Sequence, residues 1–168
     1  MPPTVLASAE QIQRRIREMA QEISRDYASK NLLLICILPN GFVFAADLIR
    51  AIDIPVSCQF VQPQRRPSPD GSPHVQIFYG AEFDVNGKDV LLLEGLVQSG
   101  QTADFLIRIF QTRGAASVKL AALVDKQTSR RVPLQPDYMG FVIEETFVVG
   151  YGMGDPHYGQ NLPYLASR

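Results

Sequence analysis

The chain has 168 residues, of which 46% are hydrophobic and 20% are charged, and its formal net charge at pH 7 is −1. This length and apolar content predict one compact domain over residues 1–168. The near-zero charge gives no electrostatic basis for binding nucleic acid or a membrane surface, and no apolar run is long enough to span a bilayer. The cysteines, Cys36 and Cys58, lie in apolar runs without metal-binding spacing, which favours a reducing cytoplasm.

The first predicted helix begins at a capping-box pattern. Ser8 is followed three residues later by Gln11, and apolar residues recur behind this pair at helical spacing. We expect the helix to run to about Tyr27 and to pack one apolar stripe against the protein body.

The next segments alternate between buried strands and helices. A continuous apolar run over Asn31–Leu38 predicts a strand buried on both faces, followed by a helix over Phe42–Ile52 and a strand over Val56–Val61. This order implies a right-handed parallel crossover. The proline-rich segment Gln62–Val75 is expected to form an exposed loop, and Ile77–Phe83 a short edge strand.

The second half of the chain continues this alternation. The turn pair Asn86-Gly87 precedes an apolar strand over Val90–Leu93, and a helical pattern over Ala103–Thr112 ends at Gly114. Further strands are predicted over Ser117–Val124, Tyr138–Ile143 and Phe147–Tyr151. Together these elements predict an α/β fold, an open and mainly parallel sheet with helices on both faces, whose ligands bind beyond the carboxyl ends of the strands.

One such strand end carries the most informative motif, KDVLLLEGLVQSGQT at Lys88–Thr102. The strand ends in an acid, Glu94, and a turn of small polar residues then leads into the next helix. A turn of this kind suits a phosphate, because backbone N–H groups and hydroxyls point outward and the helix dipole favours negative charge. An ordinary helix-capping turn is the alternative.

This segment resembles the phosphate motif of the type I phosphoribosyltransferases, and within them that of the hypoxanthine-guanine enzymes. Their pattern is an apolar strand, Glu-Asp, two apolar residues and Asp-Thr-Gly-x-Thr. The resemblance covers about Leu6 to Tyr164, and its most specific match is Phe-Val-Val-Gly-Tyr at Phe147–Tyr151. It implies the type I phosphoribosyltransferase fold, with a small hood beside the sheet, and a homodimer or homotetramer.

The resemblance also assigns roles to acids, several of which are missing here. The family's Glu-Asp pair holds the ribose of phosphoribosyl pyrophosphate and helps place Mg²⁺, whereas this chain has Glu94 and then Gly95. The family's proton-transfer Asp is replaced by Gln98, which cannot titrate. Glu94 is thus the candidate catalytic residue, and Glu94 and Glu145 are the candidate magnesium ligands.

Other departures concern the pyrophosphate. Pro39 stands in the family's pyrophosphate loop and offers neither a cation nor a backbone N–H, and Gln160 stands at the position of a pyrophosphate-binding Arg. The Ser-Tyr pair of the family's mobile loop is absent from Gln62–Val75.

The residues for the two ends of a nucleotide are retained. By resemblance, Lys126 reaches the exocyclic oxygen of a purine, Tyr138 stacks on the base, and Met139 contacts it through its backbone; a plain surface lysine is the alternative for Lys126. The residues predicted to bind the 5′-phosphate are Gln98, Ser99, Gly100, Gln101 and Thr102.

The chain thus retains the residues for the 5′-phosphate and the base but lacks several of those for the ribose, the pyrophosphate and proton transfer. Three hypotheses follow from this difference. The first is a hypoxanthine-guanine phosphoribosyltransferase-like protein that binds a purine nucleotide such as GMP or IMP, with transferase activity impaired or lost. The second is a working purine-salvage enzyme, which joins hypoxanthine or guanine to phosphoribosyl pyrophosphate and releases pyrophosphate. The third is a non-catalytic oligomeric scaffold without a small ligand.

Overall fold

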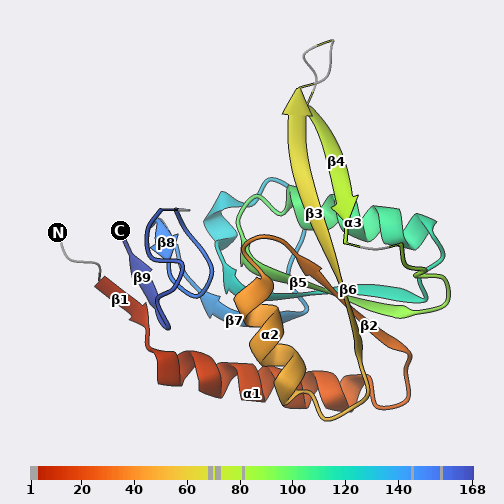
Figure 1. The fold of residues 1–168 in the computed structure, drawn as a ribbon, viewed down its shortest axis with the longest axis horizontal. Coiled ribbons are helices and arrows are strands. Elements are labelled where there is room, and N and C mark those ends of the chain that lie inside the picture. Colours follow the sequence, from red (N-terminus) through yellow and green to blue (C-terminus); the bar gives the residue numbers. More distant parts are fainter. Residues whose placement is uncertain (1–3, 68–69, 71–72, 81, 145, 156) are drawn as a thin grey trace.

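The computed structural model describes residues 4–67, 70, 73–80, 82–144, 146–155 and 157–168. The strands of its main sheet are β2 (Leu32–Ile37), β3 (Ser57–Pro67), β4 (Pro73–Tyr79), β5 (Asp89–Val97), β6 (Ser117–Asp125) and β7 (Tyr138–Val142). They lie in the order β4-β3-β2-β5-β6-β7 (Figure 1). Strands β3, β2, β5, β6 and β7 run parallel to one another. Strand β4 pairs with β3 at the edge of the sheet and is antiparallel to it. The predicted open, mainly parallel sheet is confirmed.

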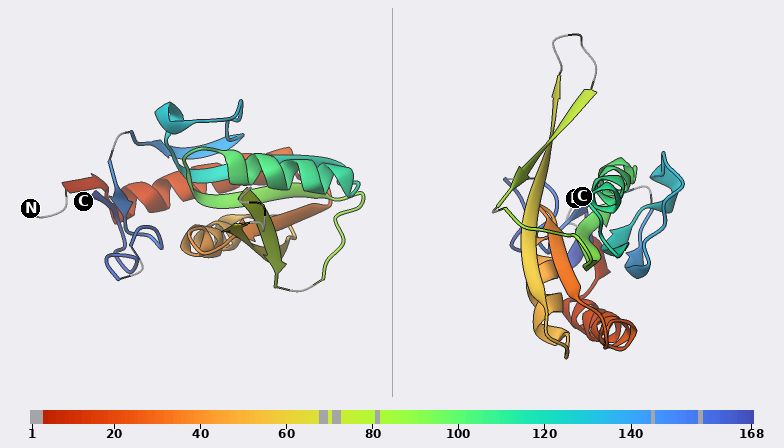
Figure 2. Two further views of the ribbon diagram at one scale, coloured as in Figure 1. Left: turned by 90° about the horizontal axis from the view of Figure 1, so that it is seen from above. Right: turned by 90° about the vertical axis from the view of Figure 1, so that its right-hand side faces the viewer.

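Helices cover both faces of this sheet (Figure 2). They are α1 (Ala9–Asp26), α2 (Phe42–Ala51) and α3 (Gln101–Thr112). The fully buried strand β2 shows how the faces are divided, because its side chains alternate between two clusters. Leu34 belongs to the cluster that contains Ile16 of α1 and Phe44 of α2, whereas Ile35 belongs to the cluster that contains Phe110 of α3. The apolar run thus serves two cores at once.

The start of α1 follows its sequence signal. Ser8 Oγ accepts a hydrogen bond from the Gln11 amide at 3.2 Å, and Gln11 Oε1 accepts one from the Ser8 amide at 2.8 Å, so the predicted capping box is formed. The helix ends at Asp26, with Tyr27 as its C-cap. None of the helices in the described ranges is long and apolar enough to cross a membrane.

A second, three-stranded sheet joins the two ends of the described chain. It consists of β1 (Thr4–Ala7), β8 (Val148–Val149) and β9 (Leu165–Ser167), in the order β1-β9-β8. All of its pairings are antiparallel, and it lies beside the main sheet, at the left of Figure 1. A small accessory hood was predicted, but β1 and β9 were not.

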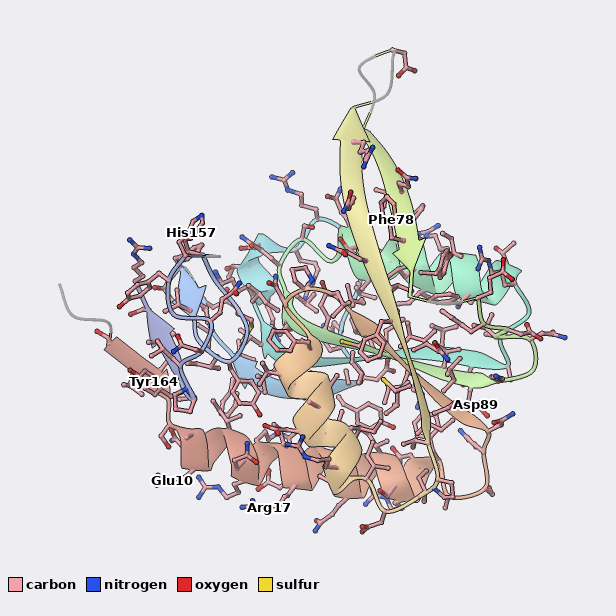
Figure 3. All side chains as sticks on the ribbon, viewed as in Figure 1. Glu10, Arg17, Phe78, Asp89, His157 and Tyr164 are labelled. Carbon is pink, nitrogen blue, oxygen red and sulfur yellow. The ribbon has the colours of Figure 1, made fainter. Side chains whose placement is uncertain are left out.

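The proline-rich segment corrects one prediction. Gln62–Val75 was expected to be a loop, yet most of it belongs to a hairpin of β3 and β4 that rises from the body, and Figure 3 shows Phe78 on it. Pairing with β2 stops at Val61, and beyond this residue β3 pairs only with β4. The outer side of β3 is therefore free there, and Pro63 can turn its missing N–H toward that side without breaking a ladder.

Candidate functional site

The candidate site lies where β2, β5 and β6 end. Two backbone hydrogen bonds join the segments after β5 and β6: the Lys126 amide donates to the Val97 carbonyl at 2.9 Å, and the Arg131 amide donates to the Ser99 carbonyl at 3.0 Å. A pocket of about 550 Å³ opens between these segments. It is lined by Gln98, Ser99, Gln101, Thr128, Ser129, Arg130 and Arg131.

The predicted phosphate turn is the entry to α3. Gly100 is the N-cap residue and has φ +77°, a left-handed conformation that glycine adopts without strain. The Gln101 amide donates to Ser99 Oγ at 3.4 Å, and the Asp104 amide to the Gly100 carbonyl at 2.9 Å. Gln98, Ser99 and Gln101 line the pocket, Gly100 is buried and Thr102 is half-buried. The arrangement is that of a helix N-terminus open to an anion.

Arg130 connects this turn to the end of β6, and the sequence reasoning did not include it. Its Nη1 donates to the Gln98 carbonyl at 3.1 Å, and its Nη2 forms an ion pair with Asp125 Oδ1. Both partners are shielded from water, with 13% of the Arg130 side chain and 1% of the Asp125 side chain exposed. The sequence offered one indication of this ion pair, an arginine five residues after the acid that follows the predicted apolar strand. We infer that Arg130 holds the turn in place.

Glu94 lies near the carboxyl end of β5 and is held in its neutral form. Its Oε2 is buried and has no hydrogen-bond partner within the described ranges. Burial raises the pKa of this carboxyl to about 8, and the positive charge of Arg130 offsets only part of that rise. At pH 7 Glu94 is therefore mostly protonated, whereas a hard cation such as Mg²⁺ takes ionised carboxylates.

The neighbouring Gly95 is packed against the turn that follows β2. A Cβ atom added to Gly95 would lie 2.1 Å from the Asn40 carbonyl oxygen and 2.8 Å from its carbonyl carbon. Both contacts are with backbone, which cannot rotate away as a side chain can. The space for an Asp side chain at position 95 is thus occupied by Asn40.

We predict that Gly95→Ala lowers the free energy of unfolding by about 1–3 kcal/mol, the usual cost of overpacking a tight contact. Denaturant unfolding followed by circular dichroism measures this loss. Gly80→Ala is the matched control, because its Cβ would meet its nearest neighbour at an ordinary 3.7 Å. Equal stability of the two variants would contradict the close contact.

The described residues alone do not form a magnesium site of the implied kind. Of the two predicted ligands, Glu94 is half-buried with its Oε2 enclosed and its pKa raised by burial, and Glu145 lies outside the described residues. Within the described ranges, no group of three or more His, Cys, Asp and Glu side chains lies close enough together to hold a metal ion.

Lys126 lies at the predicted edge of the sheet. Only 7% of the residue is exposed, and its ammonium donates a hydrogen bond to the carbonyl of Thr146. An ammonium group has three donors, so this bond leaves others for a ligand oxygen.

Tyr138, which was predicted to stack on the base, does not lie at this edge. It begins β7 opposite Ala121, and in parallel strands this register places it about 13 Å from the level of Asp125. The residue is 4% exposed, and its hydroxyl donates to Asp26 Oδ2 of α1 at 2.8 Å. Met139 is also engaged elsewhere, since its carbonyl accepts hydrogen bonds from Arg15 at 2.8 and 3.1 Å.

Phe147 is the aromatic residue that the sequence reasoning missed. It follows Thr146, whose carbonyl accepts the hydrogen bond from Lys126, and 53% of it is exposed. The sequence contained an indication of its importance, because Phe147 is the first residue of the Phe-Val-Val-Gly-Tyr segment that matches the family. An exposed aromatic next to a lysine-bound backbone fits base stacking better than a buried tyrosine does.

A mainly parallel α/β sheet with an open strand-to-helix turn at its carboxyl edge agrees with the fold of a type I phosphoribosyltransferase. The family model for the phosphoribosyl transferase domain matches residues 6–156. The chain belongs to this family.

Its relatives are hypoxanthine-guanine enzymes. The hypoxanthine-guanine phosphoribosyltransferase of Bacillus subtilis is 34% identical over 162 residues, which cover 96% of this chain and 90% of that protein. The structure of Trypanosoma cruzi hypoxanthine phosphoribosyltransferase in complex with the product IMP has a TM-score of 0.89 at 30% identity, covering 99% of this chain and 93% of that one. The bifunctional protein TilS/HprT of Listeria innocua is 35% identical over 96% of this chain, which spans only 25% of that protein.

Proposed function

We propose that residues 1–168 act as one domain that binds a purine nucleoside 5′-monophosphate, GMP or IMP, and that its transferase activity is much reduced. The phosphate would lie on the turn at residues 98–102 and the base beside Lys126 and Phe147. The observation that carries the proposal is the contact of Asn40 with Gly95, which fills the space of an acid that the family uses.

Nucleotide binding is supported by the pocket and by a relative. The pocket combines a helix N-terminus with arginine side chains, and both favour a phosphate. The Trypanosoma cruzi enzyme is described in complex with the product IMP. These two observations support a ligand of the same class for this chain.

Reduced transfer is supported by the groups that replace the family's acids. Gln98 is exposed at the position of the proton-transfer Asp and cannot act as a general base, a loss that typically costs roughly 10²–10⁴-fold in rate. Glu94 is mostly protonated at pH 7, which weakens its value as an anionic partner for the ribose and its metal.

A working hypoxanthine-guanine enzyme is the second candidate, because relatives such as the Bacillus subtilis protein bear that name. Turnover of hypoxanthine and guanine with phosphoribosyl pyrophosphate and Mg²⁺ tests it, with the Bacillus subtilis enzyme assayed in parallel. We expect kcat/KM at least roughly 10²-fold lower for this chain. Comparable turnover would reject the proposal of reduced activity.

Calorimetric titration with GMP and IMP tests binding separately from turnover. Binding only to the folded state must also raise its melting temperature. If neither heat nor a thermal shift is seen at saturating nucleotide, the protein is not a nucleotide binder, and the scaffold hypothesis, a homo-oligomer without a small ligand, takes its place.

Lys126→Ala should weaken GMP at least roughly tenfold more than AMP, because a charged hydrogen bond to the 6-oxo group is absent with AMP. Lys88→Ala, at the opposite end of β5, is the control and should change neither affinity. Equal losses for GMP and AMP would show that Lys126 does not read the purine oxygen.

A further inference from the structure

Building on the proposed function, we propose that the cleft takes its nucleotide as a metal-free monophosphate. The phosphate charge is met by Arg131 and the turn at residues 98–102, and the described residues around the site leave no place for a magnesium-bound diphosphate. Three features of the site lead to this assignment: the state of the acids, the backbone of the turn after β2, and the charges around the pocket.

The first feature is the chemistry of the acids. Oε2 of Glu94 is buried without a hydrogen-bond partner in the described structure, so this group is not set up as an exposed anionic ligand. Position 95 has no carboxylate, and the Asn40 carbonyl lies where one would start. A magnesium ion that bridges phosphates is usually held by one or two carboxylates, and of these two positions only 94 has a carboxyl, whose Oε2 is buried.

The second feature is the backbone of the turn that follows β2. Its N–H groups are largely used within the fold: the Leu38 amide donates to the Val61 carbonyl at 2.9 Å and the Gly41 amide to the Ile37 carbonyl at 3.1 Å. Pro39 has no N–H. An additional anion here would find few free backbone donors.

The third feature is the distribution of positive charge around the pocket. Arg130 is committed to Asp125 and to the Gln98 carbonyl. Arg131 is different, because its side chain is exposed, lines the pocket and has no hydrogen-bond or ion-pair partner among the described residues. Its amide is fixed to the Ser99 carbonyl, so the guanidinium extends from beside the phosphate turn. A guanidinium can bind a phosphate through two parallel hydrogen bonds.

The test is a GMP titration of the full chain by calorimetry, once with EDTA and once with excess magnesium chloride. We expect affinities that agree within about twofold. Magnesium pyrophosphate is then titrated into the GMP complex, and we expect no second binding event. The Bacillus subtilis relative, treated in the same way, provides the comparison.

Two arginine variants test the source of the charge. Arg131→Gln should weaken GMP roughly tenfold, the value of one charged hydrogen bond to a ligand. Arg17→Gln is the matched control, because Arg17 is exposed on the outer side of α1 (Figure 3) and should not affect binding.

The outcomes separate this inference from the function on which it rests. Tenfold tighter GMP binding with Mg²⁺, or a binding event with magnesium pyrophosphate, overturns the metal-free site while leaving nucleotide binding intact. Equal affinities of Arg131→Gln and Arg17→Gln overturn the role of Arg131. Absence of GMP binding under all conditions overturns the proposed function itself.

Discussion

Arg130→Met is expected to lower the free energy of unfolding by about 3–5 kcal/mol, because it leaves a buried charge without its partner. Asp125 is 1% exposed, its Oδ1 pairs with Arg130, and its Oδ2 has no hydrogen-bond partner within the described ranges. The variant also frees the Gln98 carbonyl and loosens the phosphate turn. Denaturant unfolding at neutral pH measures the loss, and GMP affinity should fall with it.

A second ion pair in the same protein provides the control for this prediction. Arg108 and Asp104 pair on the surface of α3, where the Arg108 side chain is 72% exposed. Arg108→Met should therefore cost no more than about 1 kcal/mol. Replacing both members of the buried pair, Asp125→Asn with Arg130→Met, should recover part of the loss because no unpaired charge remains. Equal costs for the two single arginine variants would contradict the assignment.

The stability that Glu94 contributes should fall as the pH rises from about 4.5, its ordinary pKa, to about 8, its pKa in the folded protein. In this window the folded state keeps the proton and the unfolded state releases it. The contribution is fully present below the window and lost above it, with a slope of about −1.4 kcal/mol per pH unit. Across the window the loss is on the order of 4 kcal/mol.

Glu94→Gln removes this titration and keeps nearly the same shape. The difference in unfolding free energy between wild type and Glu94→Gln should therefore shift in favour of the variant as the pH rises through the window. Glu10→Gln, at the exposed start of α1, provides the control and should show a nearly constant difference. A constant difference for Glu94→Gln as well would mean that the carboxyl is solvated.

The sequence predicts the main sheet well because each strand there carries a strong local signal. A continuous apolar run can only be buried on both sides, and β2 is; a capping box can only start a helix, and α1 starts there. The hairpin was not predicted because the prolines of this segment were interpreted as evidence for a loop. Beyond Val61 one side of β3 has no neighbouring strand, so a proline there removes no hydrogen bond of the sheet. Strands β1 and β9 are too short to show a recognisable alternation of apolar and polar residues.

The candidate site is predicted less completely, because its properties depend on packing. The phosphate turn could be found from its residues. The position of Tyr138 at the start of β7 could not be read from the sequence, because an aromatic-x-Gly-Phe pattern does not reveal which end of a strand it occupies. The missing acid at Gly95 is visible in the sequence, but the Asn40 carbonyl in its place is not. An aspartate restored at position 95 would therefore need the turn after β2 to move as well.

The small sheet that joins β1 to β9 has a consequence for biosynthesis. Thr4 pairs with Ser167, so the first described residues gain this partner only after the chain has been synthesised as far as Ser167. The main sheet can assemble sooner, since its strands meet over shorter stretches of chain. Hydrogen exchange should accordingly report faster opening in β1, β8 and β9 than in β2 and β5.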